Sequence, residues 1–409
     1  MEATGKVKLI GLLAWLVGVA MAGAAIAQEP LKIGAINPYS GPLALYGDEM
    51  ARGYQIAVNE RNAKGGVLGR KIELVRGDAT NPQQAIASVD QLATRDKVEI
   101  FVGTYVSAIA NAGSDAALRH QRLWWDTNAL GAELTERKLA NFVRSGPNGG
   151  HFAEVSVRAV VELIAPALGK KPNEITVALE HEDSIYGKTI ADVQKARLEE
   201  KGVKVVGVGA HNFRATDLTD VVMRARRTNA DLWVQTGYVP DTNLMLRTAR
   251  EQGYKPAAIM TVGTGDTFET LEALGAEYLE GIFVVSYPRA DISEKYAPGA
   301  SRFLDAYRKA YNRDPIAPQS LSAYGGLLTM FDAVQTAGST DPAKVRAAAA
   351  AMDKPQGSYP TGFGAKFDDK FQNTRAQPVV IQWQGGKQVT VFPVEARREG
   401  VALRNVPRK

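Results

Sequence analysis

Short apolar runs alternate with helical patterns along most of the chain, and this alternation constrains the fold more than any other feature. Residues 97–118 show it clearly: an apolar run ends at Gly103, a small polar turn covers 104–107, and an alanine-rich helical pattern follows. Strands that alternate with helices predict right-handed βαβ units and a parallel sheet. Ligands of such sheets bind at the turns that follow the carboxyl ends of the strands.

The alternation occurs in two series, from 31 to 144 and from 151 to 262, with the glycine-rich break SGPNGG at 145–150 between them. A chain of 409 residues exceeds the size of one ordinary domain. The sequence therefore predicts an α/β protein with two Rossmann-like lobes, each built on a sheet of parallel type.

Later elements set the expected domain boundaries. A strand at 281–287 and a helix at 320–337 predict that the chain returns to the first lobe, and the pattern at 377–392 predicts a hairpin around two glycines. The predicted division is a signal peptide at 1–27, a first lobe at 28–146 and 285–340, and a second lobe at 147–284 and 341–409.

The N-terminus has the pattern of an export signal. Lys6 and Lys8 precede an apolar stretch at 9–20, and Ala25, Ile26 and Ala27 form an A-x-A cleavage site. The apolar stretch is short for a membrane span, and an uncleaved anchor is the alternative. We expect cleavage after Ala27 and a periplasmic mature protein.

Composition excludes several classes of function. There is no cysteine, so disulfides, thiolate metal sites and a cysteine nucleophile are excluded. The 49 basic and 44 acidic residues are well mixed, so nucleic acid is not an expected partner. Four scattered histidines lack metal-ligand spacing, and no G-x-S-x-G elbow or P-loop occurs. We expect no catalysis, no cofactor and no metal.

Polar and aromatic residues follow several of the predicted strands. Two facing lobes would bring these strand ends together around a cleft, in which tyrosines offer an apolar wall and a hydroxyl. The turn at 104–107 also opens a helix, whose free N–H groups favour a carboxylate. The candidate ligand-binding residues are Tyr46, Ser107, Asn128, Leu130, Tyr186, Tyr238 and Asp266.

Several short motifs, in order along the chain, resemble the leucine/isoleucine/valine-binding protein family of ABC importers. They are Ser40-Gly41-Pro42 with Tyr46-Gly47, Asn59-Glu60 with Lys64-Gly65-Gly66-Val67, Asp78 before Asn81-Pro82, Gly103 to Ser107, Tyr186-Gly187, and Gly237 to Asp241. The resemblance covers nearly all of the mature chain. It implies two lobes joined by a three-segment hinge, with the ligand trapped in the cleft when the hinge closes.

The resemblance also assigns roles to residues. It implies that Ser107 binds the ligand carboxylate, that Tyr46 covers the ligand side chain, and that Tyr186 and Tyr238 close over the ligand from the second lobe. Asn128 and Leu130 occupy the loop that, in the family, offers a small residue and a threonine to the carboxylate and amine.

Two positions depart from the family pattern. Leu130 stands where the family has a threonine, and the region of Gly263 to Gly265 lacks the glutamate that pairs with the ligand ammonium. The nearest acid is Asp266. Because an unpaired buried ammonium is costly, either Asp266 takes this role or the ligand has no α-amino group.

The predicted function is periplasmic capture of a small carboxylate-bearing solute and its delivery to an inner-membrane permease, by a monomer. A branched-chain or other hydrophobic amino acid is the default ligand. An amine-free aromatic carboxylate or a short amide such as urea is the alternative. A ligand sensor for a membrane receptor and an enzyme are the other classes considered.

Overall fold

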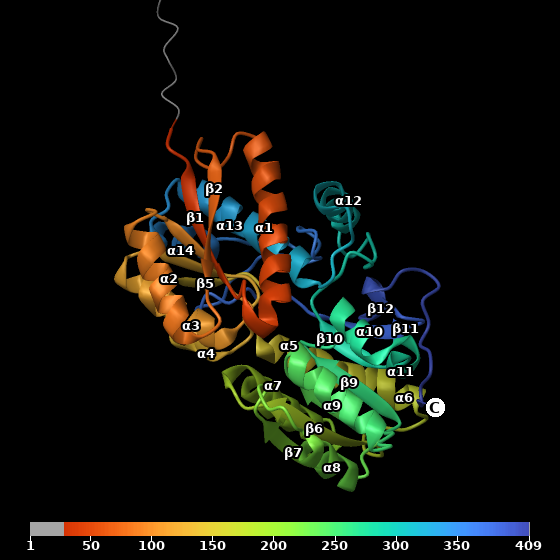
Figure 1. Ribbon diagram of the computed structural model, residues 1–409. Coiled ribbons are helices and arrows are strands. Elements are labelled where there is room, and N and C mark those ends of the chain that lie inside the picture. Colours follow the sequence, from red (N-terminus) through yellow and green to blue (C-terminus); the bar gives the residue numbers. More distant parts are fainter. Residues whose placement is uncertain (1–27, 409) are drawn as a thin grey trace, which may run out of the picture.

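Two separate sheets form the frame of the molecule (Figure 1). The computed structural model describes residues 28–408, so the expected signal peptide and its cleavage site lie outside the described residues. The first sheet is parallel throughout, in the order β2-β1-β3-β4-β5. Its strands are β1 (Leu31–Asn37), β2 (Ile72–Asp78), β3 (Ile100–Gly103), β4 (Leu123–Asp126) and β5 (Phe142–Arg144).

The second sheet has the order β12-β11-β10-β9-β8-β6-β7. Five of its strands are parallel, and β11 and β12 form the predicted antiparallel hairpin at one edge. The strands are β6 (Thr176–Glu182), β7 (Lys204–His211), β8 (Leu232–Thr236), β9 (Ala258–Val262), β10 (Phe283–Ser286), β11 (Val379–Gln384) and β12 (Lys387–Phe392). The expected fold class, two α/β lobes with parallel-type sheets, is confirmed.

Helices cover both faces of the two sheets, which explains why the central strands are apolar along their whole length (Figure 1). Every residue of β3, β4, β8 and β9 is buried. The first lobe carries α1 (Ala44–Ala63), α2 (Pro82–Thr94), α3 (Ser107–Arg119) and α4 (Glu133–Glu136). The second carries α5 (Gly149–Ala159), which continues through a π-helical turn into α6 (Ala165–Ala167), then α7 (Ile185–Glu200), α8 (Thr219–Arg227), α9 (Val239–Glu251), α10 (Phe268–Leu274) and α11 (Ala276–Leu279).

Local capping explains where several helices start. At α2, Asn81 Oδ1 accepts a hydrogen bond from the Gln84 N–H at 2.9 Å, and Pro82 occupies the first helical position. The same combination of an acceptor side chain and a following proline opens α14 (Pro342–Ala350) at Asp341. The short helices α10 and α11 are absent from the sequence-based expectation.

The chain passes between the two lobes three times within residues 28–408: between β5 and α5, between β10 and α13 (Gln319–Ala337), and between α14 and β11. The long helix α13 packs against α1, and Gly53 permits this approach because a Cβ there would lie 2.0 Å from the Ser320 carbonyl oxygen. The helix α12 (Ala300–Tyr311) also contacts α1.

Two of the predicted domain boundaries need correction. The predicted switch at 284/285 falls inside β10, all of which pairs within the second sheet. The predicted second lobe includes residues 341–409. The helix α14 at the start of this range instead packs on α13, and Arg346 Nη1 donates to the Ala140 carbonyl of the first lobe at 2.9 Å. An alanine-rich helix carries no signal in its sequence for the lobe on which it will pack.

Candidate functional site

The strand ends of the two sheets define a site between the lobes. The register places the last residues of neighbouring strands side by side, Gly103 with Asp126 in the first sheet and Thr236 with Val262 in the second. The loops that follow these strands therefore start at a common level in each lobe. This is where ligands of open α/β sheets bind.

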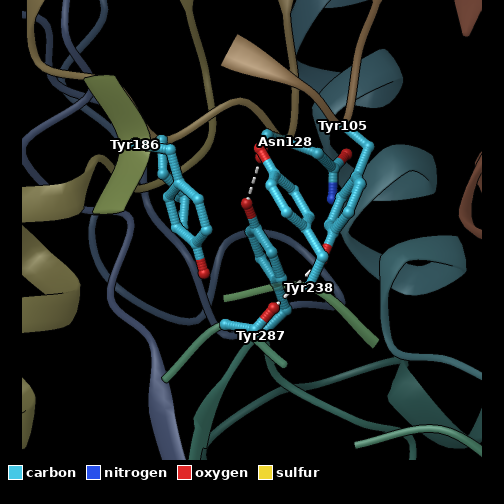
Figure 2. A pocket seen from close by; sticks show the side chains of 7 residues that line it. Tyr105, Asn128, Tyr186, Tyr238 and Tyr287 are labelled. Carbon is cyan, nitrogen blue, oxygen red and sulfur yellow. Dashed lines mark hydrogen bonds between the residues drawn. The ribbon is translucent and has the colours of Figure 1, made fainter. Parts of the chain in front are cut away.

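Residues from both lobes line a small cavity at this place, and the space between their atoms, including the part open to solvent, is about 220 Å³. Figure 2 shows the rings of four tyrosines gathered beside Asn128. The lining residues are Tyr105, Asn128, Leu130, Tyr186, Tyr238, Gly263 and Tyr287. Burial raises the pKa values of these four tyrosines well above 10, so their phenol groups remain neutral.

Asn128 is the polar group of the first-lobe wall. Its side chain is almost completely buried, with 1% exposure, and neither Oδ1 nor Nδ2 has a hydrogen-bond partner in the protein. An unpaired buried amide is unfavourable and is normally satisfied by water or a ligand. The Asn128 amide thus offers one acceptor and two donors to a bound molecule.

The loop that carries Asn128 is held from behind. Asp126 Oδ1 accepts from the Ala129 N–H at 2.9 Å, and Arg144 Nη1 donates to the carbonyls of Ala129 and Gly131 at 3.0 and 2.8 Å. Both Asp126 and Arg144 are fully buried. Burial raises the pKa of Asp126 to about 7 and lowers that of Arg144 to about 10, although the opposite charges partly offset both effects.

Tyr105 projects from the loop after β3 toward the second lobe. Its ring stacks on that of Tyr46 with a centroid separation of 4.0 Å, and its hydroxyl donates to the Gly263 carbonyl at 3.0 Å. Tyr105 therefore stands between Tyr46 and the second lobe. The Tyr46 hydroxyl is buried and has no partner in the protein.

Two second-lobe tyrosines lie at the starts of helices that buried carboxylates cap: Tyr186 at α7 and Tyr238 at α9. Glu182 accepts from Ser184 and from the Gly187 N–H at 2.7 Å, which fixes the start of α7 beside Tyr186. Asp241 Oδ1 accepts from the Tyr238 N–H at 2.9 Å at the start of α9. Capping by carboxylates at helix N-termini is favourable, so both rings have fixed positions.

Tyr186 also packs tightly against the loop after β9. Its hydroxyl donates to the carbonyls of Gly237 and Val262 at 3.1 and 2.9 Å. Gly263 has a φ of +69°, and a Cβ on it would lie 2.3 Å from the Tyr186 hydroxyl. Glycine at this position is required both by the backbone conformation and by the close approach of the ring.

A buried charge network lies behind Tyr238. His211, at the end of β7, bonds to Asp241 at 2.8 Å through Nε2 and to Glu180 at 3.1 Å through Nδ1. Arg224 Nη2 donates to both Glu180 oxygens, at 2.9 and 2.8 Å. Burial lowers the pKa of His211, but the hydrogen bonds to Asp241 and Glu180 outweigh burial and raise the pKa to about 9. The imidazolium thus links the sheet to the helix that carries Tyr238.

The fold and this arrangement agree with the comparisons to known proteins. A family model described as "Periplasmic binding protein" matches residues 30–387. The chain belongs to the periplasmic binding protein family. The match confirms the expected family and the expected class of function, solute binding.

Curated relatives of this periplasmic binding protein include the Leu/Ile/Val-binding protein homolog 7 of Brucella suis, 38% identical over 96% of this chain and 98% of the relative. Homolog 8 of the same species is 35% identical over 93% and 95%. Solved structures with the same fold include a leucine-binding protein from Thermotoga maritima, with a TM-score of 0.76 at 22% identity, which covers 88% of this chain and 97% of that chain. Another is a solute-binding protein of an ABC transporter from Rhodopseudomonas palustris in complex with p-hydroxybenzoic acid, with a TM-score of 0.75 at 22% identity over 88% and 95%.

The structure of this family member brings four of the seven predicted site residues to the cavity: Asn128, Leu130, Tyr186 and Tyr238. Tyr46 lies behind Tyr105. Ser107 is buried, and its Oγ accepts from the Gly131 N–H at 2.9 Å, so it joins two loops of the first lobe. The carboxylate-binding role expected for Ser107 stays a prediction.

Asp266 is fully buried but does not line the cavity. Its Oδ2 accepts a short hydrogen bond from Ser286, and its Oδ1 has no partner in the protein. Burial raises the pKa of Asp266, although Ser286 and the charge of Arg289 oppose this effect. The role of this residue toward an ammonium group also stays a prediction.

Three lining residues were absent from the sequence-based set: Tyr105, Gly263 and Tyr287. Tyr105 lies within the turn at 104–107 that the sequence marks as a ligand site, so a wider choice within that turn would have included it. Tyr287 ends the strand predicted at 281–287, and its hydroxyl donates a short hydrogen bond to the Asn128 carbonyl across the cleft. Nothing in the local sequence indicates that this bond forms.

Two further observations concern metal sites and membrane-spanning helices. Within residues 28–408, no cluster of three or more histidine, aspartate or glutamate side chains has the arrangement of a metal site. In the same part of the chain, no helix has both the length and the apolar character needed to cross a bilayer.

Proposed function

We propose that this protein captures one small solute between its lobes by hinge closure and delivers it to the permease of an ABC transporter. Support comes from the family, from the cavity shared by the two lobes, and from relatives whose names describe Leu/Ile/Val binding. In this proposal the chain reaches the periplasm after cleavage behind Ala27, acts as a monomer, and neither catalyses a reaction nor binds nucleic acid.

The solute that the cavity favours is an amine-free carboxylate, with aromatic carboxylates first. The observation that carries this proposal is the lining: four tyrosines, Asn128, Leu130 and Gly263, without a carboxylate. A buried ammonium group without a carboxylate costs several kcal/mol, so an α-amino acid is disfavoured. A carboxylate can instead be held by a neutral donor such as the unpaired Asn128 amide. The hydroxyls of Tyr105, Tyr186 and Tyr287 already donate to backbone carbonyls.

A hydrophobic amino acid is the second candidate, and Asp266 favours it. One buried oxygen of this carboxylate has no partner in the protein and is therefore free to accept a hydrogen bond from an ammonium group. The two candidates differ in one chemical group, the α-amine, and can be separated by ligands that differ only in that group.

The test uses the mature chain, freed of bound solute by unfolding and refolding, in a thermal-shift assay. Matched pairs are leucine with 4-methylpentanoate and phenylalanine with 3-phenylpropanoate, and the panel adds 4-hydroxybenzoate, acetamide and urea. A ligand at a hundred times its Kd stabilises the protein by about 2.7 kcal/mol. We expect shifts with the amine-free members only; a shift confined to the amino acids would overturn the proposed ligand class.

Asp266→Asn sharpens this test. If the ligand has no ammonium group, the variant should bind it with an affinity within about threefold of the original. Loss of binding in this variant, with binding retained in Ser286→Ala, would assign Asp266 to an ammonium group.

A further inference from the structure

A second and larger cavity opens beside the first, with an empty volume of about 790 Å³. Its walls come from both lobes: Leu43, Pro82 and Ile109 belong to the first, and Phe213 and Arg214 belong to the second. We call this cavity the outer groove. Nothing in the proposed capture of a small solute uses it.

The outer groove lies next to the ligand cavity, and Tyr238 lines both and separates them. The ring of Tyr238 contacts that of Phe213 at a centroid separation of 4.8 Å and that of Tyr186 at 5.2 Å. The Tyr238 ring therefore stands between the two spaces, and a ligand that occupies both displaces this ring.

The chemistry of the groove is that of an apolar channel with one cation. Three prolines, Leu43, Ile109 and Phe213 are among its apolar lining residues, and the polar side chains of Ser40, Thr80, Asn81 and Ser184 also line it. The guanidinium of Arg214 lies 5.1 Å from the centroid of the Phe213 ring, and among residues 28–408 it forms no ion pair with an acidic side chain. A cation without an acidic partner beside an apolar channel complements an anionic group at the end of an apolar chain.

We infer that the outer groove holds the distal arm of an elongated ligand, an apolar spacer that ends in a second anionic group at Arg214. The ligand class is a dicarboxylate with an apolar spacer, one carboxylate in the inner cavity and the other at the groove. This inference rests on the proposed function, since the inner carboxylate is the one placed beside Asn128.

The experiment measures Kd by isothermal titration for linear monocarboxylates and dicarboxylates of six to ten carbons, with benzoate as a short reference. Each methylene buried in the groove should strengthen binding by about two- to fourfold until the groove is filled. At equal length, the dicarboxylate should bind about three- to tenfold more tightly than the monocarboxylate at low ionic strength. The difference should shrink at 0.5 M salt, because the guanidinium is exposed.

Two variants separate the apolar and the charged contributions. Ala108→Trp, at the groove wall, should abolish the dependence of affinity on chain length. Arg214→Gln should remove the preference for dicarboxylates over monocarboxylates of equal length. Arg227→Gln is the matched control, since this exposed arginine lies on α8 away from the groove. Melting temperatures without ligand verify that each variant folds.

The outcomes distinguish this inference from the proposed function. If benzoate binds but affinity depends neither on length nor on a second carboxylate, the groove assignment is wrong and the proposed function stands. If only amino acids bind, the proposed ligand class is wrong. The comparison of length and charge is then made with amino acids: norleucine has one carboxylate, and 2-aminoadipate, 2-aminopimelate and 2-aminosuberate are dicarboxylates of increasing length. The groove assignment is overturned if the affinity in that series depends neither on ligand length nor on the second carboxylate. It is also overturned if no ligand of either series binds.

Discussion

The two walls of the ligand cavity differ in whether their polar side chains have hydrogen-bond partners within the protein. On the second-lobe wall the Tyr186 hydroxyl donates to two carbonyls of the protein, and Glu182 and Asp241 cap the helices that follow. On the first-lobe wall the Asn128 amide is buried without a partner, and the Tyr46 hydroxyl behind Tyr105 is in the same state. The Tyr186 ring of the second lobe thus contributes mainly shape, whereas the Asn128 amide of the first lobe is free to bond to a ligand.

This difference indicates which wall selects a ligand by its polar groups. A satisfied side chain gains little from a ligand, because it would exchange one hydrogen bond for another. An unsatisfied buried side chain gains a full hydrogen bond when the correct ligand arrives and rejects a ligand that lacks the matching group. The following substitutions test this difference between the two walls.

The largest effect is expected at the support of the first-lobe wall. Arg144→Leu removes hydrogen bonds to Ala129, Gly131, Gln372 and Thr135 and leaves Asp126 buried without its cation. We expect a loss of about 3–5 kcal/mol in the free energy of unfolding, measured by urea denaturation. Arg227→Leu, at an exposed position, is the control. A loss below 1 kcal/mol in the Arg144 variant would show that the loop is held by other contacts.

Asn128→Leu tests the front of the same wall. The variant should weaken binding of an amine-free carboxylate by about 100-fold, because it removes the unpaired donors and acceptor from the cavity. Its unfolding free energy should not fall, since the amide bonds to nothing in the protein. Tyr186→Phe, on the other wall, should show the reverse pattern: about 1 kcal/mol lost in stability and affinity changed by less than threefold. Equal affinity losses in the two variants would contradict the contrast.

The buried network behind Tyr238 makes the second-lobe wall sensitive to pH. The pKa of His211 is raised from 6.5 to about 9, so the proton stabilises the folded state fully below pH 6.5 and ever less as the pH rises through 9. We expect the free energy of unfolding to fall by about 3 kcal/mol between pH 6 and pH 9.5. His211→Gln should lack most of this dependence. A parallel decline in the two proteins would assign the pH effect to other groups.

The smallest effect concerns Tyr105, which connects the two walls. Tyr105→Phe removes the hydrogen bond to the Gly263 carbonyl and retains the stacking on Tyr46. The loss of about 1 kcal/mol should shift the ligand-free protein toward more open arrangements of the lobes. Small-angle X-ray scattering should then show a larger radius of gyration without ligand and an unchanged value with ligand. An unchanged value in both states would mean that the bond does not hold the lobes together.

Much of the fold was predictable from the sequence. The predicted series at 31–144 and 151–262 correspond to β1–β5 and β6–β9 with their helices, and the predicted hairpin at 377–392 corresponds to β11 and β12. Apolar runs bounded by turn residues are local signals. The lobe of α14 was not predictable, since its packing partner α13 decides it. The helix α10 was missed although Thr267 caps its start and Gly275 ends it, both of which are local signals.

The site was predictable only in part. Asn128, Leu130, Tyr186 and Tyr238 reach the cavity as expected from their places after strands. Ser107 occupies the same kind of position but turns to the Gly131 N–H, and Asp266 turns to Ser286. The position of a residue after a strand is a local property, whereas the direction of its side chain depends on the neighbours that it meets.

The two-lobed α/β architecture and the family follow from the sequence alone. The signals for them are local, because periodicity, helix caps and short motifs each involve residues close together along the chain. Only the tertiary structure decided which side chains face the solute. Tyr105 meets Gly263, 158 positions away, and the Tyr287 hydroxyl meets the Asn128 carbonyl, 159 positions away. Contacts of such range form only when the two lobes come together, and the cavity is the space that these contacts leave.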